Sequence, residues 1–322
     1  MPIVSVVVPL YNKRAYISRA LDSVLFQTIK DFEVIVVNDA SSDGGERIVE
    51  KYTDKRIRLI HRQRPGVGGH AARNEGISNA LAPIISFLDA DDQYSPNFLS
   101  VILKLAKKYR NAGAYCTSFE VISPSLKRST RCISALRNSH LEDTLLRNYF
   151  KEALSGPVIW SSAVAIPRST FESVGVFPEG VPLGGDLDMW MRIGAKFPVA
   201  ISKYSGAVYH QEAKNRIDTG EIKGLEYELV RTGEKLMASG HVAPEYLKYF
   251  REYVCMYRIG TARQLVFLGQ QDRAKEMLLK CKTNLFILPK LWWLFWAIMP
   301  SELTRQARNI KRMLRGLLGR VK

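Results

Sequence analysis

The sequence predicts an α/β fold in which helices flank a mostly parallel sheet and a helical extension follows. Three observations lead to this expectation. Short β-branched runs alternate with helical apolar spacing over the first half of the chain. The links between these runs are short, as they are in doubly wound parallel sheets. From about Gly224 onward, long helical patterns replace the alternation, with Gly240 and Gly269 as breaks.

The first half supplies four apolar runs that suit buried parallel strands, because each run is short and continuously apolar. The first run begins at Ser5 and is stopped by Pro9, which lacks the N–H that a central strand needs. We expect the other strands at Phe32–Asn38, Ile57–Ile60 and Ile84–Leu88, and helices at Lys13–Phe26, around Ile48–Tyr52 and from Ala71.

Beyond residue 95 the alternation is less regular. The stretch Ser123–Leu141 is polar and basic, and it is either a mobile loop over the site or an ordinary solvated loop. We expect helices at Pro96–Tyr109, Pro167–Gly175, from Gly184, and at Leu225–Ala238, Tyr246–Leu268 and Asp272–Lys282. Strands are expected at Ala114–Ile122, Ser161–Ile166 and Gly206–Tyr209.

The chain of 322 residues has 47 Lys and Arg against 31 Asp and Glu, a formal net charge of +16. This charge indicates an anionic partner, which could be a nucleotide, a nucleic acid or an acidic membrane surface. The four cysteines are widely spaced and form no metal-binding pattern, so we expect reduced thiols in a cytoplasmic protein. No basic leader precedes the apolar stretch Ile3–Pro9, and we therefore expect no signal peptide.

The fourth strand ends in three carboxylates, Asp89, Asp91 and Asp92. Ligands of open α/β sheets bind beyond the carboxyl ends of the strands, so these residues are expected at a ligand site. A hard cation such as Mg²⁺ or Mn²⁺, which takes oxygen ligands, would relieve their mutual repulsion. Alternatively, the stretch is a polar turn in which Asp92 or Ser95 caps the following helix.

Polar residues also follow the first two strands. Pro9, Tyr11 and Asn12 lie at the carboxyl end of the first strand, where backbone groups and a ring can hold a base. Asp39, at the same end of the second strand, either accepts the N–H of a uracil-like base or caps the next helix. Arg73 lies in a helix start opened by glycines, where it either contacts phosphate or ribose or pairs with the acidic cluster.

Five motifs between residues 3 and 210 make the chain resemble the family 2 glycosyltransferases, which have the GT-A (Rossmann-like) fold. The resemblance is to bacterial enzymes that build cell-surface polysaccharide or lipopolysaccharide. Each motif is weak alone, but their order makes the resemblance specific. The motifs are Val-Val-Pro-Leu-Tyr-Asn at 7–12, Val-Asn-Asp-Ala-Ser-Ser-Asp-Gly at 37–44, Ala-Arg-Asn-Glu-Gly at 72–76, Asp-Ala-Asp-Asp at 89–92 and Asp-Leu-Asp-Met-Trp-Met-Arg at 186–192.

The resemblance implies transfer of a sugar from a nucleotide sugar, usually with inversion, with Mn²⁺ or Mg²⁺ present. We expect a UDP-sugar as donor. Its base would contact Asp39, the rest of the nucleotide sugar would contact Asp89 and Ala90, and Asp91 would be a metal ligand. Asp89 would act through water or the ribose. The late histidine His210 would reach the metal or the diphosphate, although a lone histidine is more often structural.

Asp186 is the expected general base. An inverting transfer needs a carboxylate near the acceptor hydroxyl, on the face opposite the departing diphosphate. The resemblance places Asp188 and Trp190 on the acceptor side, as support for the site. The family usually has Glu before the base, whereas this chain has Gly185. The alternative for Asp186 is helix capping.

Two other functions are weighed against sugar transfer. A sugar-nucleotide nucleotidyltransferase, or another nucleotide-dependent enzyme on a similar sheet, would need a glycine-rich loop and a lysine directly after the first strand. Residues 9–14 contain no glycine. A nucleic-acid binder is disfavoured, because many positive charges lie in the C-terminal tail beside an aromatic apolar run that suits lipid.

We expect a catalytic domain at residues 1–215, a helical extension at 216–283 and an amphipathic, basic, membrane-associating tail at 284–322. Leu285–Met299 is rich in Leu, Phe and Trp, and no acidic residue occurs from residue 303 to 322. This composition is typical of a helix lying on an anionic bilayer. The enzyme would then sit on the cytoplasmic face of the cell membrane and meet a glycan or lipid-linked acceptor.

Two alternatives exist for the aromatic run. It could pack on the catalytic domain, or it could join two copies of the chain in a homo-oligomer, because large apolar patches also mark protein interfaces. A membrane-spanning helix is disfavoured by Pro289, Lys290 and the short length of the run.

Overall fold

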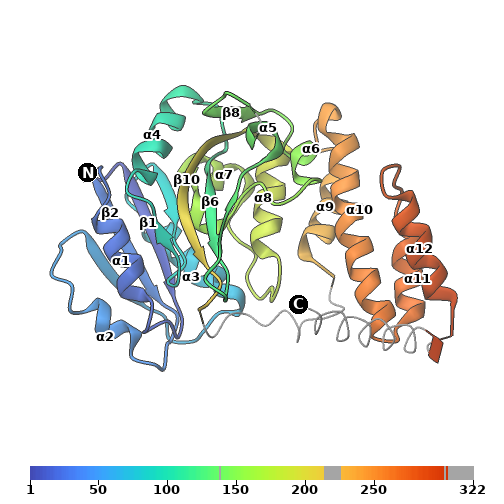
Figure 1. Ribbon diagram of the computed structural model, residues 1–322, viewed down its shortest axis with the longest axis horizontal. Coiled ribbons are helices and arrows are strands. Elements are labelled where there is room, and N and C mark those ends of the chain that lie inside the picture. The colour runs from blue at the N-terminus through green and yellow to red at the C-terminus, as the bar shows by residue number, and fades with distance from the viewer. Residues whose placement is uncertain (138, 214–225, 301, 304–322) are drawn as a thin grey trace. The chain divides into compact units, whose positions relative to one another are not determined.

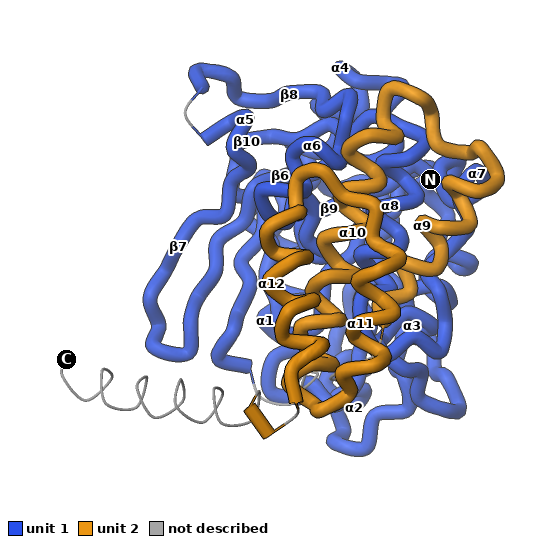
Figure 2. Tube along the Cα trace, turned by 90° about the vertical axis from the view of Figure 1, so that its right-hand side faces the viewer, with its two compact units in different colours: residues 1–217 blue, residues 218–322 orange. Residues whose placement is uncertain are grey.

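The computed structural model describes residues 1–137, 139–213, 226–300 and 302–303. The chain forms two compact units, residues 1–217 and 218–322 (Figure 2). The expected division into three segments stays a prediction, because the helix expected from Leu303 onward lies almost entirely outside the described residues.

The first unit is built on a sheet whose first four strands are parallel. β1 (Val4–Leu10) lies between β2 (Phe32–Asn38) and β4 (Ile84–Phe87), and β3 (Ile57–His61) pairs with β2. The carboxyl ends of these strands therefore meet at one edge. Pro9 does not end β1, which was expected to stop there. β4 pairs only with Val4–Val7, so at Pro9 the strand pairs with β2 alone and has no β4 partner on its other side.

The rest of the sheet is mixed. β9 (Val164–Pro167) is antiparallel to both β4 and β6 (Ala114–Ile122), and β10 (Val199–His210) is parallel to β6. The order is β3-β2-β1-β4-β9-β6-β10-β5, so the expected α/β class with flanking helices is confirmed. Short antiparallel strands complete it: β5 (Gln93–Tyr94) and β8 (Asp143–Leu146) on β10, and β7 (Arg128–Arg131) on β6.

Two expectations for this region need correction. The stretch Ser123–Leu141 is not a loop throughout, since it contains β7 and the short helix α5 (Ser134–Arg137). β10 begins at Val199, well before the expected Gly206, because its apolar first residues pair with β6 on one side and β8 on the other.

Helices cover both faces of this sheet (Figure 1). α1 (Ile17–Leu25) and α4 (Phe98–Lys108) pack their apolar residues on the face that Val6 and Val8 line. On the other face α3 (His70–Asn79) lies directly on β1, because a Cβ at Gly76 would come 2.2 Å from Val7 Cγ1. The other helices are α2 (Gly45–Val49), α6 (Tyr149–Ala153), α7 (Arg168–Val174) and α8 (Gly185–Lys196), with 3-10 turns at Val67–Gly69 and Ser161–Ala163.

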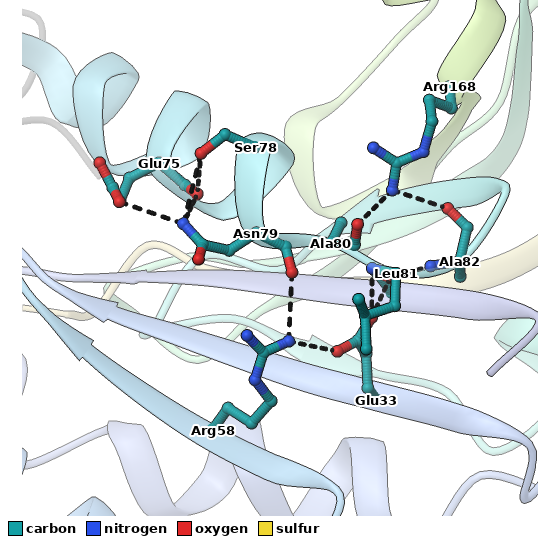
Figure 3. A network of polar contacts seen from close by, with 10 residues as sticks. Glu33, Arg58, Glu75, Ser78, Asn79, Ala80, Leu81, Ala82 and Arg168 are labelled. Atoms are coloured by element: carbon teal, nitrogen blue, oxygen red, sulfur yellow. Dashed lines mark hydrogen bonds and ion pairs between the residues drawn. The ribbon is translucent and has the colours of Figure 1, made fainter. Parts of the chain in front are cut away.

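A buried glutamate holds the opposite, amino-terminal edge of the strands together (Figure 3). Glu33 Oε1 accepts hydrogen bonds from the Ser5 hydroxyl at 2.6 Å and the Leu81 N–H at 2.7 Å, and Oε2 lies 2.8 Å from Arg58 Nη1. Arg58 also donates to the Asn79 carbonyl at 3.1 Å. Because its charge is paired and hydrogen-bonded, the buried carboxylate fixes the link between α3 and β4. The carboxyl ends of the strands remain for ligands.

The second unit is helical, as the periodicity predicted. Its helices are α9 (Glu228–Ala238), α10 (Pro244–Phe267), α11 (Gln271–Lys280) and α12 (Ile287–Ile298). Residues such as Leu265, Leu278 and Ala297 form a core shared by α10, α11 and α12. The buried Glu252 accepts the Asn284 N–H at 2.7 Å, which orders the turn before α12.

The two faces of α12 have different surroundings within this unit. Trp293 and Trp296 pack on the core of α10 and α11, whereas Leu288, Trp292 and Phe295 are 79%, 58% and 46% exposed. Their helical spacing makes one exposed apolar stripe. Nowhere in the described ranges is a helix both long enough and apolar enough to cross a membrane.

Candidate active site

The carboxyl ends of β1, β2 and β4 bring the predicted donor residues to the same edge of the sheet. Asp39 follows β2, and Asp89 and Asp91 follow β4. This arrangement is a direct consequence of the parallel pairing of β1 with both neighbours. It is also the edge at which α/β proteins bind ligands.

Asp39 is buried and is held by two residues from the loop after β3. Its Oδ1 pairs with Arg62 Nη1, and its Oδ2 accepts the Gly66 N–H at 3.0 Å. The alternative that Asp39 caps the next helix is wrong, because the N-cap of α2 is Gly44 and the first N–H of the helix, that of Gly45, is accepted by Asp43 Oδ1 at 2.9 Å. Each oxygen of a carboxylate has two lone pairs, so Asp39 keeps acceptor capacity toward a ligand.

The residues after β1 form a turn that is tied to the loop after β2. Asn12 adopts a left-handed conformation with φ of 50°, and its Oδ1 accepts the Ser42 N–H at 2.8 Å. Tyr11 is 49% exposed, so its ring is available to a ligand. Pro9 precedes them within β1, where it pairs with Val37. The first two strand ends therefore form one connected rim.

Arg73, Asp89 and Asp186 come together from three elements. Arg73, in α3, pairs with Asp89 through Nη2 and Oδ1 at 2.5 Å, as one of its two predicted roles has it, and its contact with phosphate or ribose stays a prediction. Asp186 lies in the first turn of α8 and accepts the Leu187 N–H at 2.9 Å. Burial raises the pKa of Asp186, the Arg73 charge opposes that shift, and the Asp89 charge adds to it. The N-cap of α8 is Gly184 and not Asp186, although the Asp186 side chain does satisfy the first-turn N–H of Leu187.

Asp188 and Trp190 lie deeper in α8. Asp188 is 2% exposed and pairs with Arg192 at 2.8 Å. Trp190 is 1% exposed and contacts Phe177 edge to face, with ring centroids 5.8 Å apart. Both residues thus brace the helix that carries Asp186. Their acceptor-side role stays a prediction.

His70 fills the space beside Gly185, the position where the sequence departs from the family pattern. A Cβ at residue 185 would come 2.5 Å from His70 Nε2. The imidazole stacks on Phe177 at 5.9 Å, and its Nδ1 has no partner among the described residues. Burial lowers the pKa of His70 to about 3, so the ring is neutral. No sequence pattern marks His70 as part of this site.

Asp91 is paired in the structure with a lysine. Its Oδ2 lies 2.7 Å from Lys13 Nζ, and its main-chain carbonyl accepts a hydrogen bond from Arg19. His210, the second expected metal ligand, ends β10 and is buried. Its Nδ1 lies 2.7 Å from Glu212 Oε1, and its Nε2 is buried without a partner in the described part of the chain. Burial lowers the pKa of His210, so the ring is neutral.

Asp92 has a structural role. Its Oδ2 accepts from the Ser162 hydroxyl at 2.5 Å and from Trp160 Nε1 at 3.2 Å, and its Oδ1 accepts the His210 N–H. Burial, and then the charges of the neighbouring aspartates, raise the pKa of Asp92 to about 8. The alternative that Asp92 or Ser95 caps the following helix is wrong, because Asn97 is the N-cap of α4. Asp92 instead joins the end of β4 to β10.

These side chains fit a divalent cation in part. Within the described residues no group of three or more His, Cys, Asp or Glu side chains could hold a metal. Mg²⁺ and similar ions, however, are commonly held by one or two protein ligands together with substrate phosphates. His210 has a buried Nε2 without a partner among the described residues, and the charge of Asp91 acts on the pKa of this ring. These two residues would supply one nitrogen and one carboxylate ligand, and their role in binding a metal stays a prediction.

Comparisons with known proteins agree with this geometry. The chain matches the model of glycosyl transferase family 2 over residues 5–175. An uncharacterized glycosyltransferase of Rickettsia felis is 33% identical over 203 residues, which are 62% of this chain and 32% of that protein. The putative glycosyltransferase EpsH of Bacillus subtilis is 39% identical over 107 residues, 33% of this chain and 30% of that protein. The matched parts thus span about a third of these relatives.

Among solved structures, residues 1–349 of S. aureus TarS in complex with UDP-GlcNAc have a TM-score of 0.62 with 18% identity, over 92% of this chain and 80% of that chain. This likeness shows a shared fold. The family model covers more than half of the chain. The chain therefore belongs to glycosyltransferase family 2 and has the GT-A fold.

Proposed function

We propose that this enzyme transfers a sugar from a UDP-sugar, with inversion, to a hydroxyl group of a glycan or lipid-linked acceptor. The observation that carries the proposal is the position of Asp186 beside Arg73 and Asp89. A carboxylate from α8 is thereby brought to the strand ends where a donor would bind. The family membership decides against the alternative of a nucleotidyltransferase.

The donor class rests on Asp39 and on the neighbour structure. Asp39 would accept the N–H of uracil, with its carboxylate oriented by Arg62 and Gly66. The exposed ring of Tyr11 would lie against the base. TarS, which shares the fold, was crystallised with UDP-GlcNAc, and this supports a uridine diphosphate sugar.

Asp186 would act as general base. It would remove the proton from the acceptor hydroxyl while that oxygen attacks the anomeric carbon and the bond to the diphosphate breaks. A raised pKa makes the ionised carboxylate a stronger base. Attack from the side opposite the diphosphate inverts the anomeric configuration.

Negative charge develops on the departing diphosphate, and a bound divalent cation together with Arg73 and Lys13 would stabilise it. Asp91 and His210 would hold Mn²⁺ or Mg²⁺. When bound, such an ion neutralises charge on the leaving group. Arg73 is paired with Asp89 and Lys13 with Asp91, the two aspartates on either side of Ala90. Both cations add positive charge at the same strand end.

The test is a ligand screen. A ligand that binds only the folded state raises the Tm, so UDP and UDP-sugars with Mn²⁺ should raise it more than GDP- or CDP-sugars do. EDTA should reduce the effect. The anomeric configuration of the product, read by NMR, then checks inversion. The donor assignment would be lost if a non-uridine nucleotide stabilised the protein best.

We further propose that the exposed stripe of α12 rests on an anionic bilayer on the cytoplasmic side. Leu288, Trp292 and Phe295 are exposed while the opposite face of α12 packs on α10 and α11. Seven Lys and Arg and no acidic residue occur between residues 303 and 322, and the whole chain carries +16. Apolar area with adjacent positive charge is what an interfacial helix needs.

Liposome flotation of the full chain tests this proposal. Leu288→Glu and Phe295→Glu should each reduce binding to anionic vesicles, because they place a negative charge in the stripe. Phe26→Glu is the matched control, since Phe26 is 76% exposed but lies in the first unit. Flotation that is equal for all three variants, or equal with neutral and anionic vesicles, would rule the membrane role out.

A further inference from the structure

Glu212 and Arg19 connect the two residues proposed to hold the metal. Arg19, on α1, lies 3.4 Å from Glu212 Oε1, and the same arginine donates through Nη2 to the Asp91 carbonyl at 2.5 Å. Glu212 Oε1 lies 2.7 Å from His210 Nδ1. One arginine thus touches the loop that carries Asp91 and the carboxylate that holds His210.

The position of Glu212 determines which ring nitrogen of His210 carries the proton. A carboxylate can only accept, so Nδ1 of the neutral ring must be the donor. Nε2 then carries a lone pair, and in the described residues that buried atom has no protein partner. A carboxylate behind one nitrogen and a free lone pair on the other is the arrangement that histidine ligands of metals show.

Resting on the function proposed above, we infer that Glu212 and Arg19 are positioning residues that hold His210 in its Nδ1–H tautomer and set its place relative to Asp91. Neither residue needs to touch the substrate. Glu212 is only 27% exposed at its side chain and Arg19 30%, so water does not replace their contacts freely. Their removal should therefore weaken metal binding without removing a ligand.

The first measurement is the affinity for Mn²⁺ in the presence of UDP, by titration calorimetry or EPR. Glu212→Ala should weaken it about 10- to 100-fold, the usual range for loss of a supporting carboxylate. Glu212→Gln keeps an acceptor oxygen and should lose less. Arg19→Met should act in the same direction, and combined with Glu212→Ala it should add less than its single effect, because the two residues work as one unit.

The second measurement needs no metal. In metal-free protein, nitrogen NMR should show His210 protonated at Nδ1, and Glu212→Ala should give a mixture of tautomers. His210→Gln identifies the signal. Glu276→Ala removes an exposed glutamate of the other unit and should change neither readout, and thermal unfolding checks that each variant folds.

The two readouts separate this inference from the metal proposal. A wild-type enzyme that binds no Mn²⁺ with UDP would defeat the metal proposal, while the tautomer would still report on Glu212. An Nε2–H tautomer in the wild type, or an unchanged tautomer and Mn²⁺ affinity in Glu212→Ala, would overturn the inference.

Discussion

Lys13 Nζ lies 2.7 Å from Asp91 Oδ2, and the two side chains are only 12% and 16% exposed. The lysine ammonium therefore occupies one approach to the carboxylate that would bind a metal. Any cation that uses this oxygen competes with Lys13. Lys13 lies in the segment after β1, at the strand ends where we propose that the donor binds.

We predict that Lys13→Met binds Mn²⁺ about tenfold more tightly than the wild type in the absence of nucleotide. A hydrogen bond between charged groups is worth about 1.5–3 kcal/mol, and its loss frees Asp91. Lys108→Met, which removes the lysine of the more exposed pair with Asp143, is the control. Calorimetric titration with Mn²⁺ decides the matter, and unchanged or weaker binding would show that Lys13 does not compete.

The general-base assignment predicts a separation of binding from turnover. Asp186→Asn should keep UDP-sugar affinity and lose roughly 10²–10⁴-fold in transfer rate, because the amide cannot accept the proton. Asp188→Asn should instead lower stability, since Arg192 loses its buried charge partner. Initial rates and donor Kd measured side by side test both. Transfer by Asp186→Asn at the wild-type rate would place the base elsewhere.

The close contact between Gly185 and His70 predicts that even a methyl group at position 185 destabilises the protein. Gly185→Ala should lower the free energy of unfolding by about 1–3 kcal/mol, because the new Cβ would come 2.5 Å from the imidazole. Adding His70→Ala should recover part of this loss. Gly260→Ala is the control: that glycine also lies in a helix, has no atom near its added Cβ, and should be neutral or slightly stabilising. Urea denaturation compares the four proteins.

His70 also predicts a pH dependence of stability. Its pKa is about 3 in the folded protein and near 6.5 in the unfolded chain. As the pH falls, the unfolded chain therefore binds a proton at a higher pH than the folded protein does. The contribution of the neutral ring is complete above pH 6.5 and is lost as the pH falls toward 3, by about 1.4 kcal/mol per pH unit. Relative to His70→Gln, the wild type should lose stability between pH 6 and pH 4. The exposed His241→Gln should follow the wild type, and a parallel response of His70→Gln would contradict the prediction.

The sequence alone determined the α/β class, and it indicated the edge of the sheet at which we propose the donor site. Apolar runs that end in Asp39 and in Asp89 predict parallel strands, and parallel strands place their carboxyl ends together. Asp186 was recognised through the family motif at the start of α8. The helices of the second unit followed from their apolar period, which is a local property of the chain.

Only the tertiary structure decided which side chains meet. Lys13 with Asp91, Arg62 with Asp39, and Glu212 with His210 and Arg19 are contacts between loops and helix faces, and most of them join segments far apart in the sequence. Strand β5 has two residues, too few to show a period. The split of α12 into a packed and an exposed face likewise depends on where α10 and α11 lie against it. Local patterns indicate how each segment folds, whereas these pairings depend on the register and packing of segments that the sequence does not bring together by itself.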